Sequence, residues 1–571
     1  MFIKTKRNQS GSFSVQLIES VRVLGKKNPR SVLIQTFGSG RSKEEIAYLK
    51  QRAQVYLDHL MGQRNQAKAE KGKDGSSLEN ACQLVIQVPE DISHCDSYVC
   101  GFHDVFGPVY DSIFKNTGLK AKENRMLKDL SIMRIIHPKS KRFTSKIASQ
   151  YNCNLTLDGI YKLMDRIDSQ VIETIQRLSF KNTQTLLKSE KEELEVLFYD
   201  MTTLYFEVGS SDELREFGFS KDGKHAHVQI MMAIITTKSG LPLGYELFPG
   251  NSYEGHTLVP VLEKLQEKYK IKKVIVVADS GLISKDNVKE ISKMGLEYIL
   301  GGRVKNGSKA LKKAVLDEAG YTPLTPTLKG KIFYPPVSKK KKNQDEATSQ
   351  NNSQKSDEPD AQKNEEEEIL DRIYIYHCQT RAHKDQHERE KQVDKVKENI
   401  GKPVKSKLGG VYKKPFVSIG EDKSVIGIDE EALERIAQFD GFFTLETNLK
   451  DAPMLDILNY YRALWQIEQT FRIIKYNIAL RPIFHYNTDR IKAHFAMCYI
   501  ALVLIRTLEY KTTQNGVYLP LEQLNELLRT VRIINLTIKE KHYKIAQDFP
   551  QTLIPIYKAL KIKPPNRFLS L

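Results

Sequence analysis

Three acidic residues occupy positions from which carboxylates can bind divalent metal ions. Asp200 ends the segment LEVLFYD, Asp279 ends KVIVVAD, and Glu468 lies in YYRALWQIEQTFRIIK. Clustered carboxylates repel one another without a cation, and Mg²⁺ prefers such hard oxygen ligands. Two ions roughly 3.5–4 Å apart activate the attacking oxygen and stabilise the leaving oxygen in phosphoryl displacement. Taken alone, either aspartate is better explained as a turn or cap residue after a strand.

The segment around Glu468 predicts a helix over 460–475, because its apolar residues recur at helical spacing. Arg472 follows Glu468 by four residues and Lys475 by seven, so a continuous helix places both beside the glutamate. The pattern is consistent with an ion-pair ladder. A metal ligand with phosphate-holding cations beside it gives the same pattern, although the ladder is the simpler interpretation of this helix taken alone.

The elements that must bring these acids together are predicted strands and helices of an α/β fold with a mixed sheet. Strands are predicted over 194–200, 202–208, 228–237, 241–250, 273–279 and 297–304, with helices over 255–269 and 286–294. Two aspartates at strand ends converge if their strands are neighbours. A helix packed on that sheet can then present Glu468 to them.

The bulk composition favours a polyanionic partner. The chain has 571 residues, a formal net charge of +18 and a pI of about 9.2, and a basic excess raises the local affinity for phosphate. The sequence has no G-x-x-x-x-G-K-[ST] phosphate loop, which disfavours a nucleotide kinase or ATPase. The N-terminus lacks the apolar core of a signal peptide, and the longest apolar stretch, 495–505, predicts a buried helix rather than a membrane span.

The six cysteines are scattered, which suits a reducing cytoplasm. No C-x-x-C pair exists, and this argues against a zinc ribbon. Cys95 and Cys100, together with His94 and His103, have metal-ligand chemistry, although a structural role for them is the simpler interpretation.

Several segments together resemble the DDE transposases of bacterial insertion sequences. They are FYDMTTLYFE around Asp200, FPGNSYEGHTL, VVADSGL around Asp279, FDGFFTLETN and the Tyr-Arg-Glu-Lys helix around Glu468. The resemblance covers roughly 190–510. The sequence departs from the family pattern four residues before the glutamate, where the family has arginine and this chain has Leu464.

The resemblance implies an RNase H-like mixed sheet flanked by helices, with a β-rich insertion domain and a mainly helical N-terminal region. Together with the residue patterns outside 190–510, it divides the chain into six predicted parts: 1–75, a β-hairpin plus helix; 76–185, a helical DNA-binding region; 186–304, the first part of the catalytic core; 305–438, the insertion domain with a disordered loop near 338–368; 439–515, the second part of the core with the glutamate helix; and 516–571, a C-terminal helical tail.

The same resemblance implies a site and a reaction. Asp200, Asp279 and Glu468 would be the catalytic acids that hold two Mg²⁺ ions, with Mn²⁺ as a substitute, and Tyr461 and Lys475 would grip the phosphate. Hydrolysis at the element ends would free 3′-OH groups that attack target DNA. The expected partners are the terminal inverted repeats, the target DNA and a second copy of the chain. We expect no membrane association and a location on the nucleoid in the bacterial cytoplasm.

Further residues are predicted to contact DNA, and most of them also have a simpler structural explanation. Arg472 is a candidate replacement for the arginine missing at position 464. Trp465 can stack on a displaced base, although core packing explains it more simply, and core packing is also an alternative for Tyr461. Lys221 and Lys224 lie in a basic turn that either contacts DNA or is a solvated hairpin.

Two other functions are compatible with the same residues. One is an RNase H-like nuclease that cuts without joining. The other is an inactive DNA-binding derivative of a transposase, and the intact acids argue against it.

Overall fold

The computed structural model divides into two compact units, Met1–Ile92 and Ser93–Leu571. The structure describes residues 2–7, 12–21, 30–40, seven positions between 46 and 57, 92–192, 194–207, 210–218, 227–269, 274–279, 285–305, 307–335, 372–403, 414–450, 452–538 and 541–570. In the first unit β1 (Phe2–Arg7), β2 (Phe13–Val21) and β3 (Arg30–Gly40) form an antiparallel sheet, one strand more than the predicted hairpin. Much of the helix predicted to follow, and the boundary near 75, lie outside the described residues.

The second unit begins with a strand, β4 (Ile92–Val99), and then becomes helical. The helices are α2 (Gly101–Ile113), α3 (Ala121–Ile136), α4 (Lys141–Ile147), α5 (Leu157–Met164) and α6 (Ser169–Ser189). Ser140, Thr156 and Asp168 cap α4, α5 and α6, each accepting a hydrogen bond from a backbone N–H of the first turn. Helices thus make up most of 101–189, almost all of it within the region predicted as helical over 76–185.

A nine-stranded mixed sheet is the centre of the second unit, in the order β10-β11-β12-β15-β9-β8-β5-β6-β7. Its RNase H-like part consists of β5 (Val196–Tyr205), β6 (Gln229–Thr237), β7 (Pro242–Pro249), β8 (Ile275–Ala278) and β9 (Glu297–Gly301). β5 pairs antiparallel with β6 and parallel with β8. The two strands predicted at 194–200 and 202–208 are one strand, because the ladder with β6 continues without a turn. Asp200 therefore lies within a strand and not at its end.

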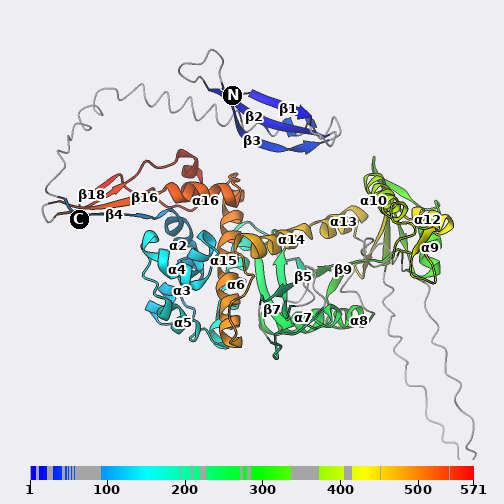
Figure 1. The fold of residues 1–571 in the computed structure, drawn as a ribbon, viewed down its shortest axis with the longest axis horizontal. Helices are drawn as coiled ribbons and strands as arrows, with labels where there is room; N and C mark the ends of the chain where they lie inside the picture. The colour runs from blue at the N-terminus through cyan, green and yellow to red at the C-terminus, as the bar shows by residue number, and fades with distance from the viewer. Residues whose placement is uncertain are drawn as a thin grey trace, which may run out of the picture. The chain divides into compact units, whose positions relative to one another are not determined.

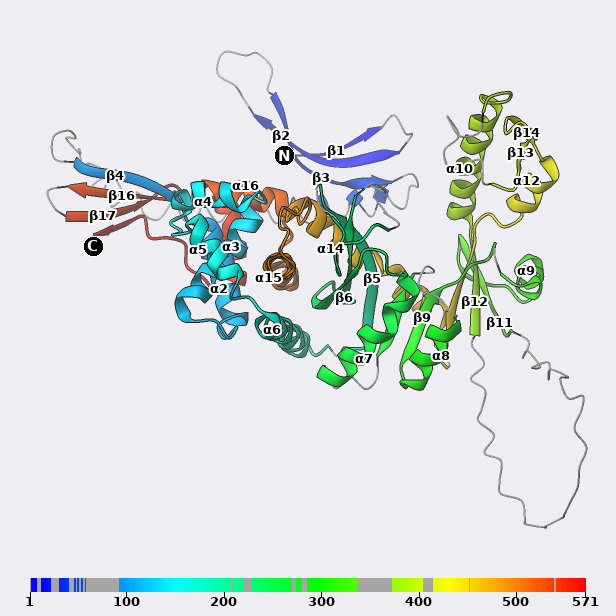
Figure 2. The same cartoon turned by 60° about the horizontal axis from the view of Figure 1, so that its bottom comes forward.

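The insertion adds strands to this same sheet. They are β10 (Thr322–Thr325), β11 (Leu328–Phe333), β12 (Arg372–Cys378) and, where the chain returns to the core, β15 (Phe442–Thr447). Figure 2 shows them beside α9 (Lys309–Leu316), α10 (Gln379–Lys397), α12 (Glu430–Ala437) and the hairpin of β13 (Val417–Ile419) and β14 (Val425–Ile428). The loop predicted near 338–368 lies outside the described residues.

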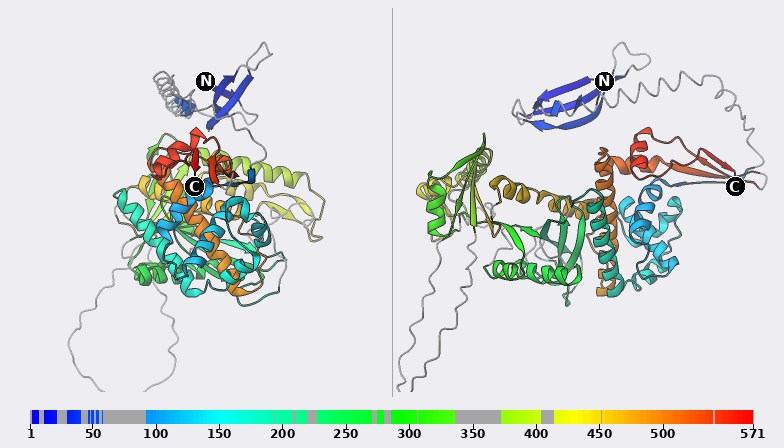
Figure 3. Two further views of the ribbon diagram at one scale, coloured as in Figure 1. Left: turned by 90° about the vertical axis from the view of Figure 1, so that its left-hand side faces the viewer. Right: turned by 180° about the vertical axis from the view of Figure 1, so that it is seen from behind.

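Helices cover both faces of the RNase H-like part (Figures 1 and 3). α7 (Leu258–Tyr269) and α8 (Lys285–Lys293) pack on one face, and α13 (Met454–Arg462) and α14 (Trp465–Arg472) pack on the other. Successive side chains of a strand point to opposite faces. In β5, Tyr199 joins the core beneath α7, whereas Phe198 joins the core beneath α14.

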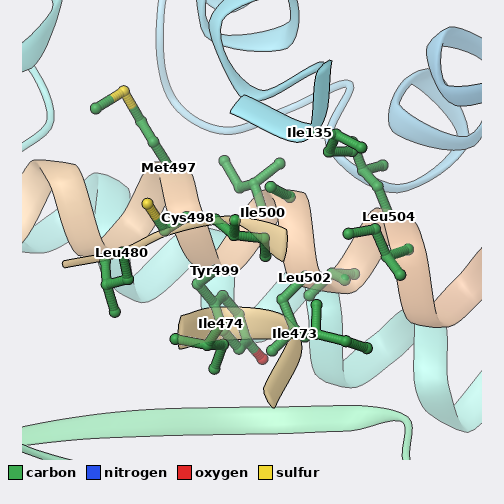
Figure 4. Close-up of a cluster of buried hydrophobic side chains, with 14 of the residues drawn as sticks. Ile135, Ile473, Ile474, Leu480, Met497, Cys498, Tyr499, Ile500, Leu502 and Leu504 are labelled. Carbon is green, nitrogen blue, oxygen red and sulfur yellow. The ribbon is translucent and has the colours of Figure 1, made fainter. Parts of the chain in front are cut away.

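A long apolar helix, α15 (Thr488–Gln514), ties the sheet to the helical region. It contacts α2, α3 and α6 as well as β7. Figure 4 shows its side chains packed with Ile135 of α3 and with Ile473 and Ile474. The helix is long and apolar enough to cross a membrane, yet 94% of its most apolar window is buried inside the protein. The predicted buried helix around 495–505 is thus confirmed as part of a core helix.

The prediction of a helical tail over 516–571 is wrong, because this region contains three strands as well as helices. After α16 (Leu521–Thr530), the chain forms β16 (Arg532–Ile538), β17 (Lys541–Ala546) and, after the short α17 (Ile554–Ala559), β18 (Phe568–Ser570). These strands form a sheet with β4 in the order β18-β17-β16-β4. The segment RIINLTI is rich in β-branched residues, which favour strands, and its partner β4 lies more than 400 residues earlier.

Shortening one buried side chain of α15 should show how much the stability of the protein depends on the packing of this helix. Leu502 is fully buried, so Leu502→Ala is expected to lower the free energy of unfolding by about 2–5 kcal/mol. Denaturant unfolding followed by circular dichroism measures the change. Tyr518→Ala, at a residue that is 71% exposed, should alter stability by no more than about 0.5 kcal/mol. Equal losses in the two variants would contradict a core role for α15.

Candidate active site

The pairing of β5 with β8 brings the two aspartates together. Tyr199 pairs with Ala278 in the parallel ladder, so Asp200 and Asp279 are the next residues along two adjacent strands. Ile275 and Val277 of β8 face the α14 side of the sheet, and alternation continues this face to Asp279. Asp200 lies on the same face by the same alternation from Phe198. The two carboxylates therefore share one face and one level of the sheet.

The third acid is presented by α14, which packs over β5 and β6. Ile467 and Phe471, four residues apart, are buried against the sheet and leave the neighbouring Glu468 exposed. Arg506 of α15 holds this helix from behind. Its guanidinium donates hydrogen bonds to the backbone oxygen of Gln466 at 3.0 Å and to Thr470 Oγ1 at 2.8 Å. The position of Glu468 thus depends on core packing and on a buried arginine.

All three acids line one cavity of about 390 Å³. Asp200 is half-buried there and accepts a hydrogen bond from the backbone N–H of Met201 at 2.7 Å, whereas Asp279 and Glu468 are exposed. The other lining residues come from the insertion strands and helix and from the α13–α14 segment: Cys378, Arg381, Phe443, Leu458, Tyr461, Arg462, Leu464, Trp465 and Ile467.

The prediction of one continuous helix over 460–475 is wrong. α13 ends at Arg462, α14 begins at Trp465, and the N–H groups of Ala463 and Leu464 bond to carbonyls three residues back. A tight turn of this kind changes the direction of the side chains after it. Arg462, which a straight helix directs away from Glu468, consequently lines the same cavity as the glutamate.

Tyr461 connects α13 to the acids. Its hydroxyl donates a hydrogen bond to Asp279 Oδ1 at 3.3 Å. Burial raises the pKa of Tyr461, the negative charge of Asp279 raises it further, and Arg381 opposes the shift. The tyrosine therefore stays a neutral donor at physiological pH. Gly301 of β9 makes this approach possible, because a Cβ at that position would overlap the Tyr461 hydroxyl.

The remaining predicted residues are placed as follows. Trp465 lines the cavity and is 54% exposed, so the alternative of core packing does not hold. Arg472 is exposed and lies near Glu522 of α16, whose carboxyl pKa is lowered first by a hydrogen bond from Asn477 and to a smaller extent by the charge of Arg472. Lys475 falls in a π-helical turn, Ile473–Asn477, and neither it nor Arg472 is among the described residues that line the cavity. Lys221 and Lys224 lie outside the described residues.

Sequence reasoning missed the contribution of the insertion. Arg381, in the first turn of α10, lines the cavity with its guanidinium 5.0 Å from the ring centre of Phe443 on β15. Asp385 lies one turn further along the helix, 3.8 Å from Arg381 Nε. No spacing in the sequence links position 381 to Asp279, about a hundred residues earlier. Only the pairing of β12 with β15 brings the start of α10 to the cavity.

The site combines three carboxylates with two guanidinium groups. Oxygen-only donors of this kind fit divalent cations such as Mg²⁺, and planar guanidinium groups fit phosphate oxygens. An open cavity with both sets of groups can bind a phosphodiester beside metal ions.

Comparison with known proteins identifies the family. Residues 191–504 match the family described as transposase DDE domain. Among solved structures, the chain resembles the piggyBac transposase synaptic complex with hairpin DNA at 9% identity and a TM-score of 0.34, over 75% of this chain and 78% of that one. It also resembles the Mos1 transposase paired-end complex with left transposon end at 12% identity and a TM-score of 0.14, over 30% of this chain and 57% of that one. No curated protein matches the chain.

The mixed sheet flanked by helices, with the strand order described above, is an RNase H-like fold. The match extends over more than half of the sequence, and the chain belongs to the transposase DDE domain family. It is a DNA transposase.

Gly301 offers a test of how Tyr461 is positioned. Gly301→Ala is expected to push the Tyr461 hydroxyl away from Asp279 and to cost about 1–3 kcal/mol of stability by overpacking. Thermal and denaturant unfolding measure the loss. Adding Tyr461→Phe removes the overlapping oxygen and should restore part of it. Gly427→Ala, at a glycine with nothing within 4 Å of an added Cβ, is the control, and no recovery in the double variant would argue against the contact.

Proposed function

We propose that this transposase cleaves DNA at the ends of its element and joins the freed 3′ ends to target DNA, with Asp200, Asp279 and Glu468 as its catalytic acids. The observation that carries the proposal is the meeting of these three carboxylates, from β5, the end of β8 and α14, at one cavity. The sequence resemblance to the family implies the same three residues as its metal-binding acids.

The three carboxylates would hold two Mg²⁺ ions, for which Mn²⁺ would substitute. When bound, such ions activate the attacking oxygen and stabilise the leaving oxygen of the phosphodiester. The half-buried Asp200 is already oriented by the Met201 amide. Asp279 and Glu468 line the same cavity and are exposed, so a DNA backbone that enters it would meet them.

The two chemical steps use the same bond changes. In the first, a water oxygen bonds to the phosphorus at the element end, and the P–O3′ bond breaks to leave a 3′-OH. In the second, that hydroxyl attacks a target phosphorus, the new P–O bond joins the strands, and the displaced target 3′ oxygen takes up a proton. Both reactions need the phosphate held in line with its nucleophile.

Arg381 and Arg462 are our candidates for holding that phosphate. The family arginine four residues before the glutamate is Leu464 here, whereas both of these guanidinium groups line the cavity. We propose that they take over its function, and that Arg472 and Lys475 contact DNA outside the cavity. Tyr461 keeps Asp279 in place through its hydrogen bond.

Trp465 is proposed as a stacking platform. It is the only tryptophan of the chain, it is 54% exposed, and it lies three residues before Glu468 on the cavity wall. Keeping a large aromatic ring exposed beside a phosphate site suits stacking on an unpaired base, an interaction worth about 1–3 kcal/mol.

The proposed partners are the terminal inverted repeats, the target DNA and a second copy of the chain that pairs the two ends. The net charge of +18 supports DNA as the partner. We propose action on DNA in the cytoplasm, which agrees with five described cysteines that are all free thiols.

Neutralising one acid tests the site. Asp279→Asn keeps the shape of the side chain but removes its charge, so Mg²⁺-dependent nicking of an end substrate should fall by more than about 100-fold, the upper range for losing a metal's outer-shell partner. Binding of the same DNA, measured by fluorescence anisotropy in Ca²⁺, should be retained. Glu468→Gln should likewise lower the nicking rate and retain DNA binding.

Nicking that survives in Asp279→Asn would contradict the site assignment. A labelled end supplied with target plasmid then separates the two steps in the unaltered protein. Joined product supports the transposition reaction, whereas cleavage without joining would reduce the proposal to a nuclease.

The insertion arginine can be tested on its own. Arg381→Ala should lower the nicking rate about 10- to 100-fold, the range expected for hydrogen bonds to a charged group. Arg435→Ala is the matched control, because Arg435 belongs to α12 of the same insertion and pairs at the surface with Glu431. Equal rates in the two variants would exclude a phosphate role for Arg381.

A further inference from the structure

A second group of metal-ligating side chains lies in the helical region, apart from the cavity of the three acids. His103 comes from α2, Asp129 from α3, and Cys153 from the turn after the 3-10 helix Ala148–Tyr151. Their donor atoms all lie within 4.8 Å of one another. The three residues are separated by 26 and 24 positions, so the sequence offers no ligand spacing that reveals them.

The distances within this group match those between ligands of one ion. His103 Nε2 lies 3.3 Å from Cys153 Sγ and 3.5 Å from Asp129 Oδ1. Zinc bonds of about 2.0–2.3 Å at tetrahedral angles separate nitrogen from sulfur by about 3.6 Å and nitrogen from oxygen by about 3.4 Å. The two distances from His103 Nε2 are therefore within a few tenths of an ångström of those in a zinc site, and Cys153 Sγ and Asp129 Oδ lie within 4.8 Å of one another.

No tautomer of His103 lets Nε2 accept from the thiol and donate to the carboxylate at the same time. The same ring nitrogen, Nε2, faces both the thiol and the carboxylate. If the thiol donates to Nε2, that nitrogen has no proton to offer to the carboxylate of Asp129. If Nε2 carries the proton and donates it to Asp129, it is no acceptor for the thiol. A cation between the three atoms satisfies all of them.

The burial of the group also suits a metal. Cys153 is 7% exposed, and the side chains of His103 and Asp129 are 22% and 17% exposed. A metal that binds there displaces the thiol proton, and the resulting thiolate is stabilised by the ion.

We propose that His103 Nε2, Asp129 Oδ1 and Cys153 Sγ bind one Zn²⁺ ion that fastens α2, α3 and the turn before α5 to one another. A mixed sulfur, nitrogen and oxygen donor set suits zinc, whereas Mg²⁺ takes oxygen ligands. Three protein ligands leave the fourth tetrahedral position for water. The ion is structural in its effect, since it connects segments that otherwise meet through side-chain packing.

Metal analysis of the full-length purified chain is the direct experiment. Protein expressed with added zinc and freed of loose metal by a weak chelator should contain about one zinc ion per chain by mass spectrometric metal analysis, as one tetrahedral site requires. Cys153→Ser and Asp129→Asn should each lower the content to background. Removal of zinc from the unaltered protein should lower its melting temperature, and in Cys153→Ser the chelator should have no such effect.

Cobalt distinguishes this site from the acidic cavity, which contains a cysteine of its own, Cys378. Co²⁺ bound to a thiolate gives a sulfur-to-metal charge-transfer absorption that carboxylates cannot produce. The absorption should appear in the unaltered protein, persist in Cys378→Ser and disappear in Cys153→Ser. Circular dichroism verifies that each variant is folded. If Cys153→Ser is not folded, the zinc content of Asp129→Asn tests the proposed site instead.

Two results would overturn the proposal. One is an unaltered chain that contains no zinc and shows no cobalt–thiolate absorption. The other is an absorption that disappears with Cys378→Ser and not with Cys153→Ser, which would assign the metal to the acidic cavity. Neither result depends on DNA cleavage, so the proposed transposition chemistry is tested separately.

Discussion

The parallel pairing of β5 with β8 determines where the acids of this transposase can meet. The register of a strand decides which face each of its side chains points to, because a shift by one residue turns every side chain to the opposite face. With Tyr199 opposite Ala278, both following aspartates project towards α14. A one-residue slip would send one carboxylate towards α7 and separate the pair. The apolar residues that alternate along β5 and β8 therefore fix the site as firmly as they fix the core.

Bringing three carboxylates to one cavity is unfavourable in the protein alone. Two unit charges near a protein surface repel by on the order of a few kcal/mol at about 4 Å. The fold offsets this with neutral donors and cations around the acids: the Met201 amide on Asp200, the Tyr461 hydroxyl on Asp279, and Arg381 and Arg462 on the cavity wall.

Much of this arrangement could be predicted from periodicity. The apolar runs before Asp200 and Asp279 predict two strands, and the buried helix around 495–505 follows from its composition alone; that the two strands are neighbours came only from the structure. The break between α13 and α14 could not be predicted, because Ala463 and Leu464 are good helix formers and only tertiary packing turns the chain there. The strands of the C-terminal sheet were missed for a similar reason: β16 finds its partner β4 more than 400 residues away. Arg381 and the group of His103, Asp129 and Cys153 depend likewise on contacts between distant segments.

The place of the insertion explains why it can contribute to the site without disturbing the core. The chain leaves the RNase H-like sheet after β9 and returns as β15, which pairs with β9 itself. Both ends of the insertion are thus fixed on one strand edge, next to β8 and Asp279. A segment inserted elsewhere along the chain would reach the acids only across the helices that cover the sheet. Here β12 adds to β15, and the start of α10 carries Arg381 directly to the cavity. Such an insertion can change one wall of the cavity while the carboxylates, held by β5, β8 and α14, keep their positions.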